Sequence, residues 1–294
     1  MDINFELYKI FYKTAKLGSM SKAAKELFTS QPAISQSIKL LEEKLGGQLF
    51  HRTSQGVSLT SEGKEIYKYI EQSYGLIQTA ERRFLDLKNL SSGQLRIAVS
   101  TTACNIFLLK YLEEFSIAYP QIKIFVNDQS TQKTIEELEL GEVDIGIMNL
   151  KENNEAITII KEIEIQDCFV ANKKYKDICD KEISLNEMIT YPVILMQKGL
   201  NTREFIDEYF LSYGLSILPQ IELSTMEMLI EFAKRGLGLS CVIKDYVQKE
   251  LKEYQLFEVT LKEKIPKRRL SIAINKRIPA STAAQAFIDL IVSK

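Results

Sequence analysis

Apolar side chains near the start of the chain recur three and four positions apart, the spacing of a helix. Residues 5–17 form the first such run, and Gly18 after it supplies a stop signal. A second, shorter helix follows, with Ser21 as its expected N-cap. Its inward face is expected to hold Ala23, Ala24 and Leu27.

The pattern of the third helix is the more informative. Ser30 offers a capping hydroxyl, Pro32 is tolerated in a first turn, and the helix is expected to end at Gly46. One stripe is apolar (Ile34, Ile38, Leu41 and Leu45), and another is polar (Gln31, Pro32, Ser35, Gln36 and Lys39). A polar stripe of this kind is often only solvated. After two tightly connected helices, it favours insertion into the major groove of DNA, where amides pair with adenine and ammonium groups with guanine or phosphate.

Residues 48–60 are typical of two short strands around a turn, which is the pattern of a wing. Arg52 is expected beside the phosphate backbone. Thr53 and Ser54 offer hydrogen bonds to the DNA backbone, which position the protein on DNA but do not read its sequence.

A long helix should follow, with Thr60 as N-cap and an end near Asn89. Its apolar seam advances in alternating steps of four and three, as in a coiled coil. Its length favours burial against a second copy of the chain over burial on the chain's own second domain. The seam consists of Ile66, Ile70, Ser73, Ile77, Ala80, Phe84 and Leu87.

From residue 94 the pattern alternates between strand and helix, which predicts parallel sheets with crossover helices. Strands are expected at 94–100, 122–126, 143–147, 168–171, 193–196, 221–224, 239–243 and 270–274. Helices are expected at 105–119, 131–140, 202–213, 225–235 and 280–292.

Hydroxyl-rich sequence stands at several strand-to-helix junctions. Ligands of open sheets bind outside the carboxyl ends of strands, and helix N-termini attract anions. Simple helix capping is the alternative at any one junction. Together the junctions favour a small organic anion, an organic acid or amino acid, as ligand; they are Ser100-Thr101-Thr102, Ser130-Thr131, Asn201-Thr202 and Ser224-Thr225.

Composition narrows the function classes. The net charge is −1, yet residues 1–58 carry +3 and the remainder −4. A single histidine, His51, leaves little material for histidine-based catalysis or metal binding, so neither an enzyme nor a cofactor is expected. No apolar run is long enough for a membrane span, and the start has no signal-peptide layout, so a cytoplasmic protein without membrane contact is expected.

The N-terminal run closely resembles the LysR-type family of transcriptional regulators. The resemblance extends over 18–27, 30–39, Leu41-Glu42, Leu45-Gly46, Leu49-Phe50, Arg52 and 59–63. The family pattern often has arginine where Gln55 stands, which puts one wing contact in doubt. Weaker matches follow at 143–147 and 232–239.

The resemblance implies an N-terminal winged helix-turn-helix (residues 1–60), a dimerising linker helix (61–89) and a two-lobed α/β effector domain (90–294) similar to periplasmic binding proteins. Lobe 1 would comprise about 93–162 and 269–294, and lobe 2 about 163–268. The DNA-contacting residues would be Ser21, Ser30, Gln31, Pro32, Ser35, Gln36, Lys39, Arg52 and Thr53. The effector-contacting residues would be Ser100, Thr101, Thr102, Ser130, Asn149 and Thr202, with Thr225 close by.

The implied partners are double-stranded promoter DNA, a small-molecule effector, further copies of the chain as a homodimer or homotetramer, and RNA polymerase. Two alternatives stay open. One is the same fold triggered by cysteine oxidation, with Cys168 and Cys179 as candidates. The other is an enzyme or solute-binding protein with an attached helical domain.

Overall fold

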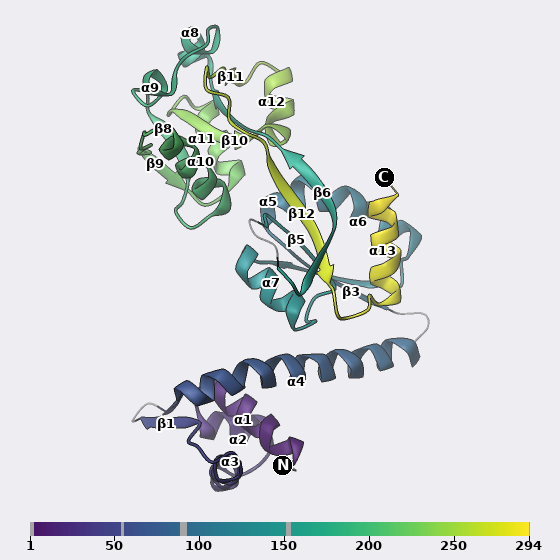
Figure 1. The fold of residues 1–294 in the computed structure, drawn as a ribbon. Coiled ribbons are helices and arrows are strands. Elements are labelled where there is room, and N and C mark those ends of the chain that lie inside the picture. Colours follow the sequence, from purple (N-terminus) through teal and green to yellow (C-terminus); the bar gives the residue numbers. More distant parts are fainter. Residues whose placement is uncertain (1–2, 54–55, 89–92, 151–153, 294) are drawn as a thin grey trace. The chain divides into compact units, whose positions relative to one another are not determined.

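A computed structural model describes residues 3–53, 56–88, 93–150 and 154–293 (Figure 1). The chain separates into two compact units. One holds residues 1–92 and the other holds most of residues 93–294. The predicted hinge at residues 90–93 lies, except for Gly93, outside the described residues.

The first unit is a three-helix bundle with a two-stranded wing and a long helix. Its elements are α1 (Phe5–Leu17), α2 (Met20–Glu26), α3 (Gln31–Leu45), β1 (Phe50–Thr53), β2 (Gly56–Leu59) and α4 (Ser61–Lys88). The strands β1 and β2 pair antiparallel. The predicted stop signals of α1 and α3 and the predicted start signals of α3 and α4 are confirmed. Gly18 and Gly46 end α1 and α3 in left-handed conformations, Ser30 caps α3, and Thr60 caps α4.

One N-cap was predicted wrongly. Helix α2 begins two residues earlier than expected, because the hydroxyl of Ser19 accepts the backbone N–H of Lys22 at 3.3 Å. Ser21 lies inside the helix, exposed to solvent. Both serines precede the same apolar residues, so the local pattern could not separate them.

The core of this unit forms where α1, α3 and the wing meet. Ile34, Ile38 and Leu41 of α3 are buried as predicted. The rings of Phe11 and Phe50 lie 5.4 Å apart, so the first helix packs directly on the wing. This packing holds α3 in place and so fixes the position of its polar stripe.

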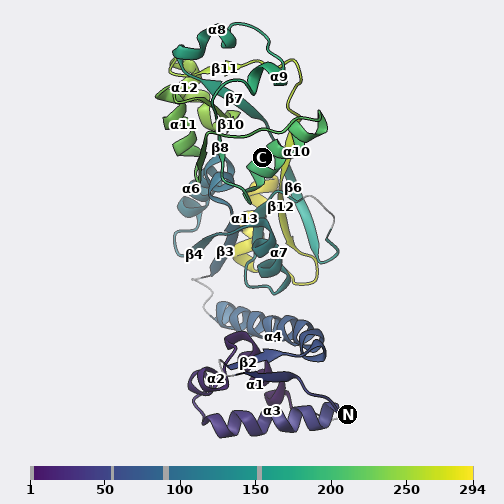
Figure 2. The same ribbon diagram turned by 90° about the vertical axis from the view of Figure 1, so that its left-hand side faces the viewer.

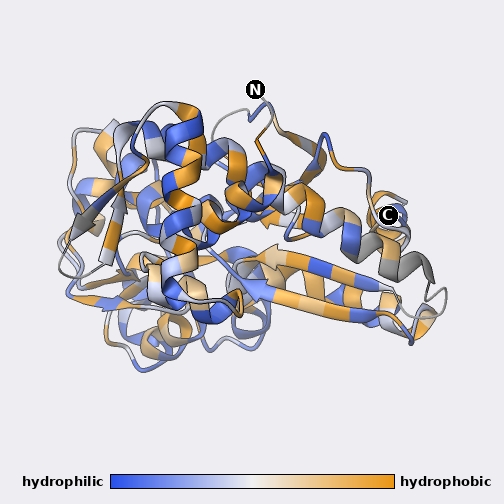
Figure 3. Ribbon diagram, turned by 90° about the horizontal axis from the view of Figure 1, so that it is seen from below, coloured by the Kyte–Doolittle hydropathy of each residue, from blue (hydrophilic) through white to orange (hydrophobic). Residues whose placement is uncertain are grey.

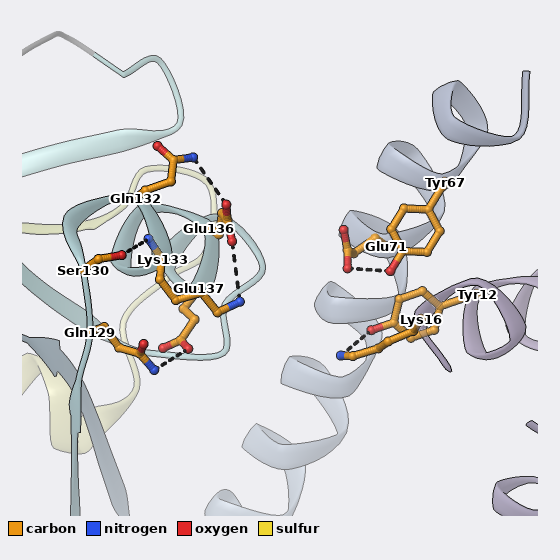
Figure 4. A network of polar contacts seen from close by, with 10 residues as sticks. All are labelled: Tyr12, Lys16, Tyr67, Glu71, Gln129, Ser130, Gln132, Lys133, Glu136 and Glu137. Carbon is orange, nitrogen blue, oxygen red and sulfur yellow. Dashed lines mark hydrogen bonds and ion pairs between the residues drawn. The ribbon is translucent and has the colours of Figure 1, made fainter. Parts of the chain in front are cut away.

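Two tyrosines at the edge of this core, Tyr12 and Tyr67, each make a polar contact with a charged residue of their own helix (Figure 4). The hydroxyl of Tyr67 donates to Glu71 at 2.8 Å, and Lys16 donates to the hydroxyl of Tyr12 at 3.0 Å. The rings of Tyr12 and Tyr67 stack with centroids 5.8 Å apart. The start of α4 is therefore fixed against α1.

The predicted seam of α4 divides into two parts. Ile66 and Ile70 pack against the core of the first unit. Ile77 is 39% exposed and Phe84 is 59% exposed, so the distal part presents apolar side chains to solvent. Leu87 has no described side chain.

The second unit contains two five-stranded sheets. The lobe 1 sheet has the strand order β4-β3-β5-β12-β6, and the lobe 2 sheet has the order β11-β7-β10-β8-β9. Lobe 1 holds β3 (Gln94–Val99), α5 (Thr101–Ala103), η1 (Cys104–Leu108), α6 (Leu109–Ala118), β4 (Lys123–Asp128), α7 (Thr131–Glu139), β5 (Ile145–Met148), β6 (Ile157–Ile165), β12 (Arg268–Asn275) and α13 (Thr282–Val292). Lobe 2 holds β7 (Asp167–Ala171), η2 (Lys173–Tyr175), α8 (Lys176–Cys179), α9 (Leu185–Met188), β8 (Val193–Met196), α10 (Asn201–Ser212), β9 (Ile221–Leu223), α11 (Met226–Lys234), β10 (Leu239–Ile243), η3 (Lys244–Val247), α12 (Gln248–Lys252) and β11 (Phe257–Val259).

Each sheet has helices on both faces. In lobe 1, α6 and α13 cover the face that carries Ile97, and α7 covers the face that carries Ala98 (Figure 1). In lobe 2, α10 covers the Leu195 face and α11 covers the Ile194 face (Figure 2). Alternate residues of one strand thus enter different cores, as a strand buried on both faces requires.

The sheets are mixed, not parallel as predicted. β12 pairs antiparallel with β5 and β6, and β7 pairs antiparallel with β10 and β11. The reason is topological: the chain crosses between the lobes twice, at β6–β7 and again at β12, and the returning strand runs opposite to the strands of the βα units. Strand β6 (Ile157–Ile165) was also missed.

No helix within the described ranges is both long enough and apolar enough to cross a bilayer. Figure 3 shows polar positions interrupting the apolar ones along the helices.

Candidate nucleic-acid interface and ligand cleft

Helix α3 presents the polar stripe that the sequence predicts. Gln31, Pro32, Gln36 and Lys39 are exposed, and Ser35 is half-buried. Lys39 lies 3.7 Å from Glu43 in an ion pair whose side chains are 74% and 60% exposed. A pair this open is weak, so the ammonium group can turn to another anion at little cost.

The remaining residues predicted to contact DNA flank this stripe. Ser30 is exposed and caps α3 by accepting the N–H of Ala33 at 3.3 Å. Thr53 is exposed in the wing, where its hydroxyl donates to the carbonyl of Gly56 at 3.1 Å. The backbone of Arg52 belongs to β1, and its side chain lies outside what is described.

Two contacts that sequence reasoning missed hold the wing in place. Glu42 of α3 accepts the backbone N–H groups of Leu49 and Phe50 at 2.7 and 3.3 Å. A Cβ on Gly56 would lie 2.3 Å from the carbonyl oxygen of Gly18, so only glycine fits where the wing meets the end of α1. These contacts hold the wing in a fixed position relative to α1 and α3.

The second unit contains a cleft of about 320 Å³ between its lobes. Both sheets supply lining residues, from strand ends and from the helices that follow them. The cleft brings together six of the seven residues predicted to contact an effector: Ser100, Thr101, Thr102, Ser130, Asn149 and Thr202.

Thr225 is the exception. Its hydroxyl turns back to cap α11 by accepting the N–H of Met228 at 3.3 Å, and Ser224 lines the cleft in its place. The helix-capping alternative is the better account of Thr225.

An acidic residue that the sequence did not single out, Asp128, also lines the cleft. Its side chain, at the end of β4, accepts the backbone N–H of Thr101 at 3.0 Å and the Thr101 hydroxyl at 2.5 Å. The first N–H of α5 is thus already bound to a carboxylate of the protein itself.

The cationic side chain in the cleft lining is Arg268, at the start of β12. Its guanidinium donates to Asp167 through two nitrogens, at 2.6 and 3.0 Å, and to the hydroxyl of Thr202 at 2.9 Å. The Asp167 side chain is fully buried and that of Arg268 is 7% exposed. This pair joins both crossing segments, since Asp167 begins β7.

Helix N-termini from both lobes meet in the cleft. Helix α10 begins after Leu200, whose side chain cannot cap it, and Asn201 donates to the hydroxyl of Thr131 at 2.8 Å. Ser130 accepts the N–H of Lys133 at 3.3 Å, and Gln129 donates to Glu137 at 3.0 Å (Figure 4). The Asn201 contact links the lobes on one side of the cleft.

A second link between the lobes starts from η1, a turn of π-helix. Its Asn105 amide lies within hydrogen-bonding distance of Glu227 at 3.1 Å and of the Tyr246 hydroxyl at 2.5 Å. The next residue, Ile106, packs against the core formed by α11 and its sheet face. Asn105 and Ile106 of this turn thus form the second contact between lobe 1 and lobe 2.

The cysteines bear on the oxidation alternative. Cys168 faces the α11 side of the lobe 2 sheet, and Cys179 packs on the opposite side, so the two thiols are separated by the sheet. Burial raises the pKa of the Cys179 thiol to about 11 and raises that of Cys168 further. A thiol in this state reacts slowly.

A helix-turn-helix with a wing, carried on the same chain as a two-lobed α/β unit with a polar cleft, defines a ligand-responsive DNA-binding regulator. Two family models match the sequence: "Bacterial regulatory helix-turn-helix protein, lysR family" over residues 5–64, and "LysR substrate binding domain" over residues 88–294. The chain belongs to the LysR family of transcriptional regulators, which confirms the resemblance.

Curated relatives extend over most of the chain. The transcriptional activator CmpR of Synechocystis is 28% identical over 233 residues, 79% of this chain and 76% of that protein. The RuBisCO operon transcriptional regulator of Allochromatium vinosum is 26% identical over 295 residues, 100% of this chain and 97% of that one. CysL of Bacillus subtilis is 25% identical over 98% of this chain and 97% of its own.

Solved structures agree in fold. Full-length CbnR complexed with its target DNA has a TM-score of 0.64 and 17% identity, with 98% of this chain and 99% of that one covered. Corynebacterium glutamicum OxyR, in a structure with bound hydrogen peroxide, has a TM-score of 0.55 and 18% identity, with 100% and 94% covered.

Proposed function

We propose that this regulator binds promoter DNA as a homodimer through α3 and responds to a small-molecule effector in its cleft. The observation that carries the DNA-binding part is the polar stripe of α3, whose exposed amides and ammonium group are backed by the buried residues Ile34, Ile38 and Leu41. In this proposal Gln31 and Gln36 contact base edges, and Lys39 contacts guanine or phosphate.

Lys39 gives the direct test. DNA fragments enriched from a random duplex library by the wild-type protein serve as ligand, and fluorescence anisotropy measures affinity from low to high salt. Lys39→Ala should weaken binding and lower the salt slope by about one unit if the ammonium contacts phosphate. Lys249→Ala, an exposed lysine of α12, is the control for lost charge. Equal effects of the two variants would contradict the assignment.

The proposed dimer uses the distal seam of α4. Ile77, 39% exposed, lies on this seam, and Gln78 is exposed beside it. A charge on the seam would be buried in the dimer, so Ile77→Glu should give monomers in sedimentation velocity at concentrations where wild type dimerises. Gln78→Glu should leave the dimer intact. A monomeric wild-type protein would overturn this part of the proposal. Tetramers and contact with RNA polymerase stay predictions.

The cleft is proposed as a sensing site. Two contacts, Asn201 with Thr131 and Asn105 with Tyr246, join the lobes, so a ligand that adds contacts to both lobes would favour closure. Closure would then change the DNA affinity of the dimer, and DNA would change effector affinity by the same factor. A compound that stabilises the protein but leaves its DNA affinity unchanged would contradict the coupling.

A further inference from the structure

We infer that the effector carries a positively charged amino group as well as a carboxylate, and that Asp128 binds the amino group. The inference rests on the proposed sensing function of the cleft and narrows its ligand class. An amino acid or a similar zwitterion fits this description, and a simple organic acid does not.

The charge balance of the cleft supports an amino group. Among the described residues that line it, the charged side chains are Asp128 and Arg268. The charge of Arg268 is matched by Asp167 in a two-point contact, with both side chains nearly or fully buried. The Asp128 carboxylate is exposed to the cleft, and its contacts with Thr101 come from a neutral amide and a neutral hydroxyl. The lining therefore presents an unmatched negative charge.

Asp128 is also held in a fixed position. One carboxylate oxygen accepts the backbone N–H of Thr101, and the other accepts the Thr101 hydroxyl. An ionised carboxylate offers about four acceptor sites, so both oxygens can accept a further donor. An ammonium group has three donors and no acceptor, which makes it the matching partner. A second carboxylate at this place would meet like charge.

The opposite wall of the cleft suits an anion. Helix α10 has twelve residues and starts at Asn201, and its preceding residue Leu200 gives no side-chain cap. Asn201 and Thr202 of this first turn line the cleft. Backbone N–H groups and the helix dipole there favour a carboxylate. A zwitterion would thus place its amino group against lobe 1 and its carboxylate against lobe 2, which contacts both lobes at once.

A purely structural role of Asp128 is the competing account. As a cap of α5, Asp128 would serve only to accept the N–H of Thr101. Asparagine keeps that acceptor and removes the charge, so Asp128→Asn separates the two roles. Asp180→Asn in lobe 2 removes one negative charge from an exposed site outside the cleft lining and is the matched control.

The experiment compares amino acids with their counterparts that lack the amino group. The pairs are L-glutamate and glutarate, L-aspartate and succinate, L-leucine and isocaproate, and L-phenylalanine and hydrocinnamate, tested by thermal shift and then by calorimetric titration of the full chain. Wild type should bind at least one amino acid and bind its counterpart at least about tenfold more weakly, the loss expected for one hydrogen bond to a charged group.

For that amino acid, Asp128→Asn should weaken binding by about tenfold or more, Asp128→Glu should restore part of the affinity, and Asp180→Asn should match wild type. Melting of the free variants checks that each is folded. The inference is overturned if the counterparts bind as tightly as the amino acids, or if Asp128→Asn binds the amino acid as wild type does. If no compound of either kind shifts the melting of wild type, the inference is overturned, whereas the sensing function of the cleft does not depend on an amino group and is tested by effectors of other classes.

Discussion

Replacing Asp167 with asparagine should destabilise the second unit strongly. Asp167 and Arg268 are joined at 2.6 and 3.0 Å, with the Asp167 side chain fully buried and that of Arg268 7% exposed. The substitution leaves the guanidinium charge in a site that water barely reaches. Removing one partner of such a pair costs about 3–5 kcal/mol, a large part of the roughly 5–15 kcal/mol that holds a typical domain together.

Urea unfolding followed by circular dichroism measures this loss. With an m value of about 2.5 kcal/mol/M, the midpoint should fall by about 1–2 M. Glu162→Gln is the matched control, because Glu162 pairs at 3.0 Å with Arg269, the next residue of the same strand, but those side chains are 39% and 66% exposed. An exposed pair contributes about 0–1 kcal/mol. The reasoning is refuted if the two substitutions lower the midpoint equally.

Three further predictions concern single side chains. Phe28→Gly should raise the free energy of unfolding by about 1 kcal/mol in the same urea assay, because Phe28 has a φ of 53° and its side chain is 97% exposed; a loss of stability would contradict this. Burial raises the pKa of Tyr246 to about 12. The folded state therefore holds this proton to higher pH than the unfolded state does. The contribution of Tyr246 to the free energy of unfolding is full below about pH 10 and is lost as pH rises toward 12. Between pH 10 and 12 the free energy of unfolding of Tyr246→Phe should fall less than that of wild type. Equal slopes of this free energy against pH for the two proteins would contradict the raised pKa of Tyr246. Cys179, whose pKa burial raises to about 11, should react with iodoacetamide at pH 8 more slowly than an unfolded cysteine does, and equal rates would revive the oxidation alternative.

Local signals made the first unit predictable. Ser30 with Pro32 and the glycines that follow α1 and α3 act within one helical turn, so the sequence alone is sufficient to identify them. Where two local signals compete, as Ser19 and Ser21 do before α2, the pattern cannot choose. The distal seam of α4 is visible in the sequence because its period is local. The surface that covers this seam is not visible in the sequence.

The cleft was only partly predictable, because local signals identify helix starts but not the contacts between distant segments of the chain. Hydroxyl groups at strand-to-helix junctions mark helix starts, and these starts gather at one cleft because the sheet topology brings them together. Asp128 pairs with Thr101 and Arg268 with Asp167 across long stretches of chain, and no local pattern links them. The antiparallel pairing of β12 with β6 likewise depends on the chain returning to lobe 1 after lobe 2.

Selection from a random duplex library, carried out in parallel with wild type and with Gln36→Ala, tests most directly whether α3 contacts base pairs in two copies. Wild type should enrich two inverted half-sites, and the variant should lose preference at the same position in both halves, a change worth about 1–3 kcal/mol per base pair. An enriched sequence without two-fold symmetry, or one identical for both proteins, would contradict the account.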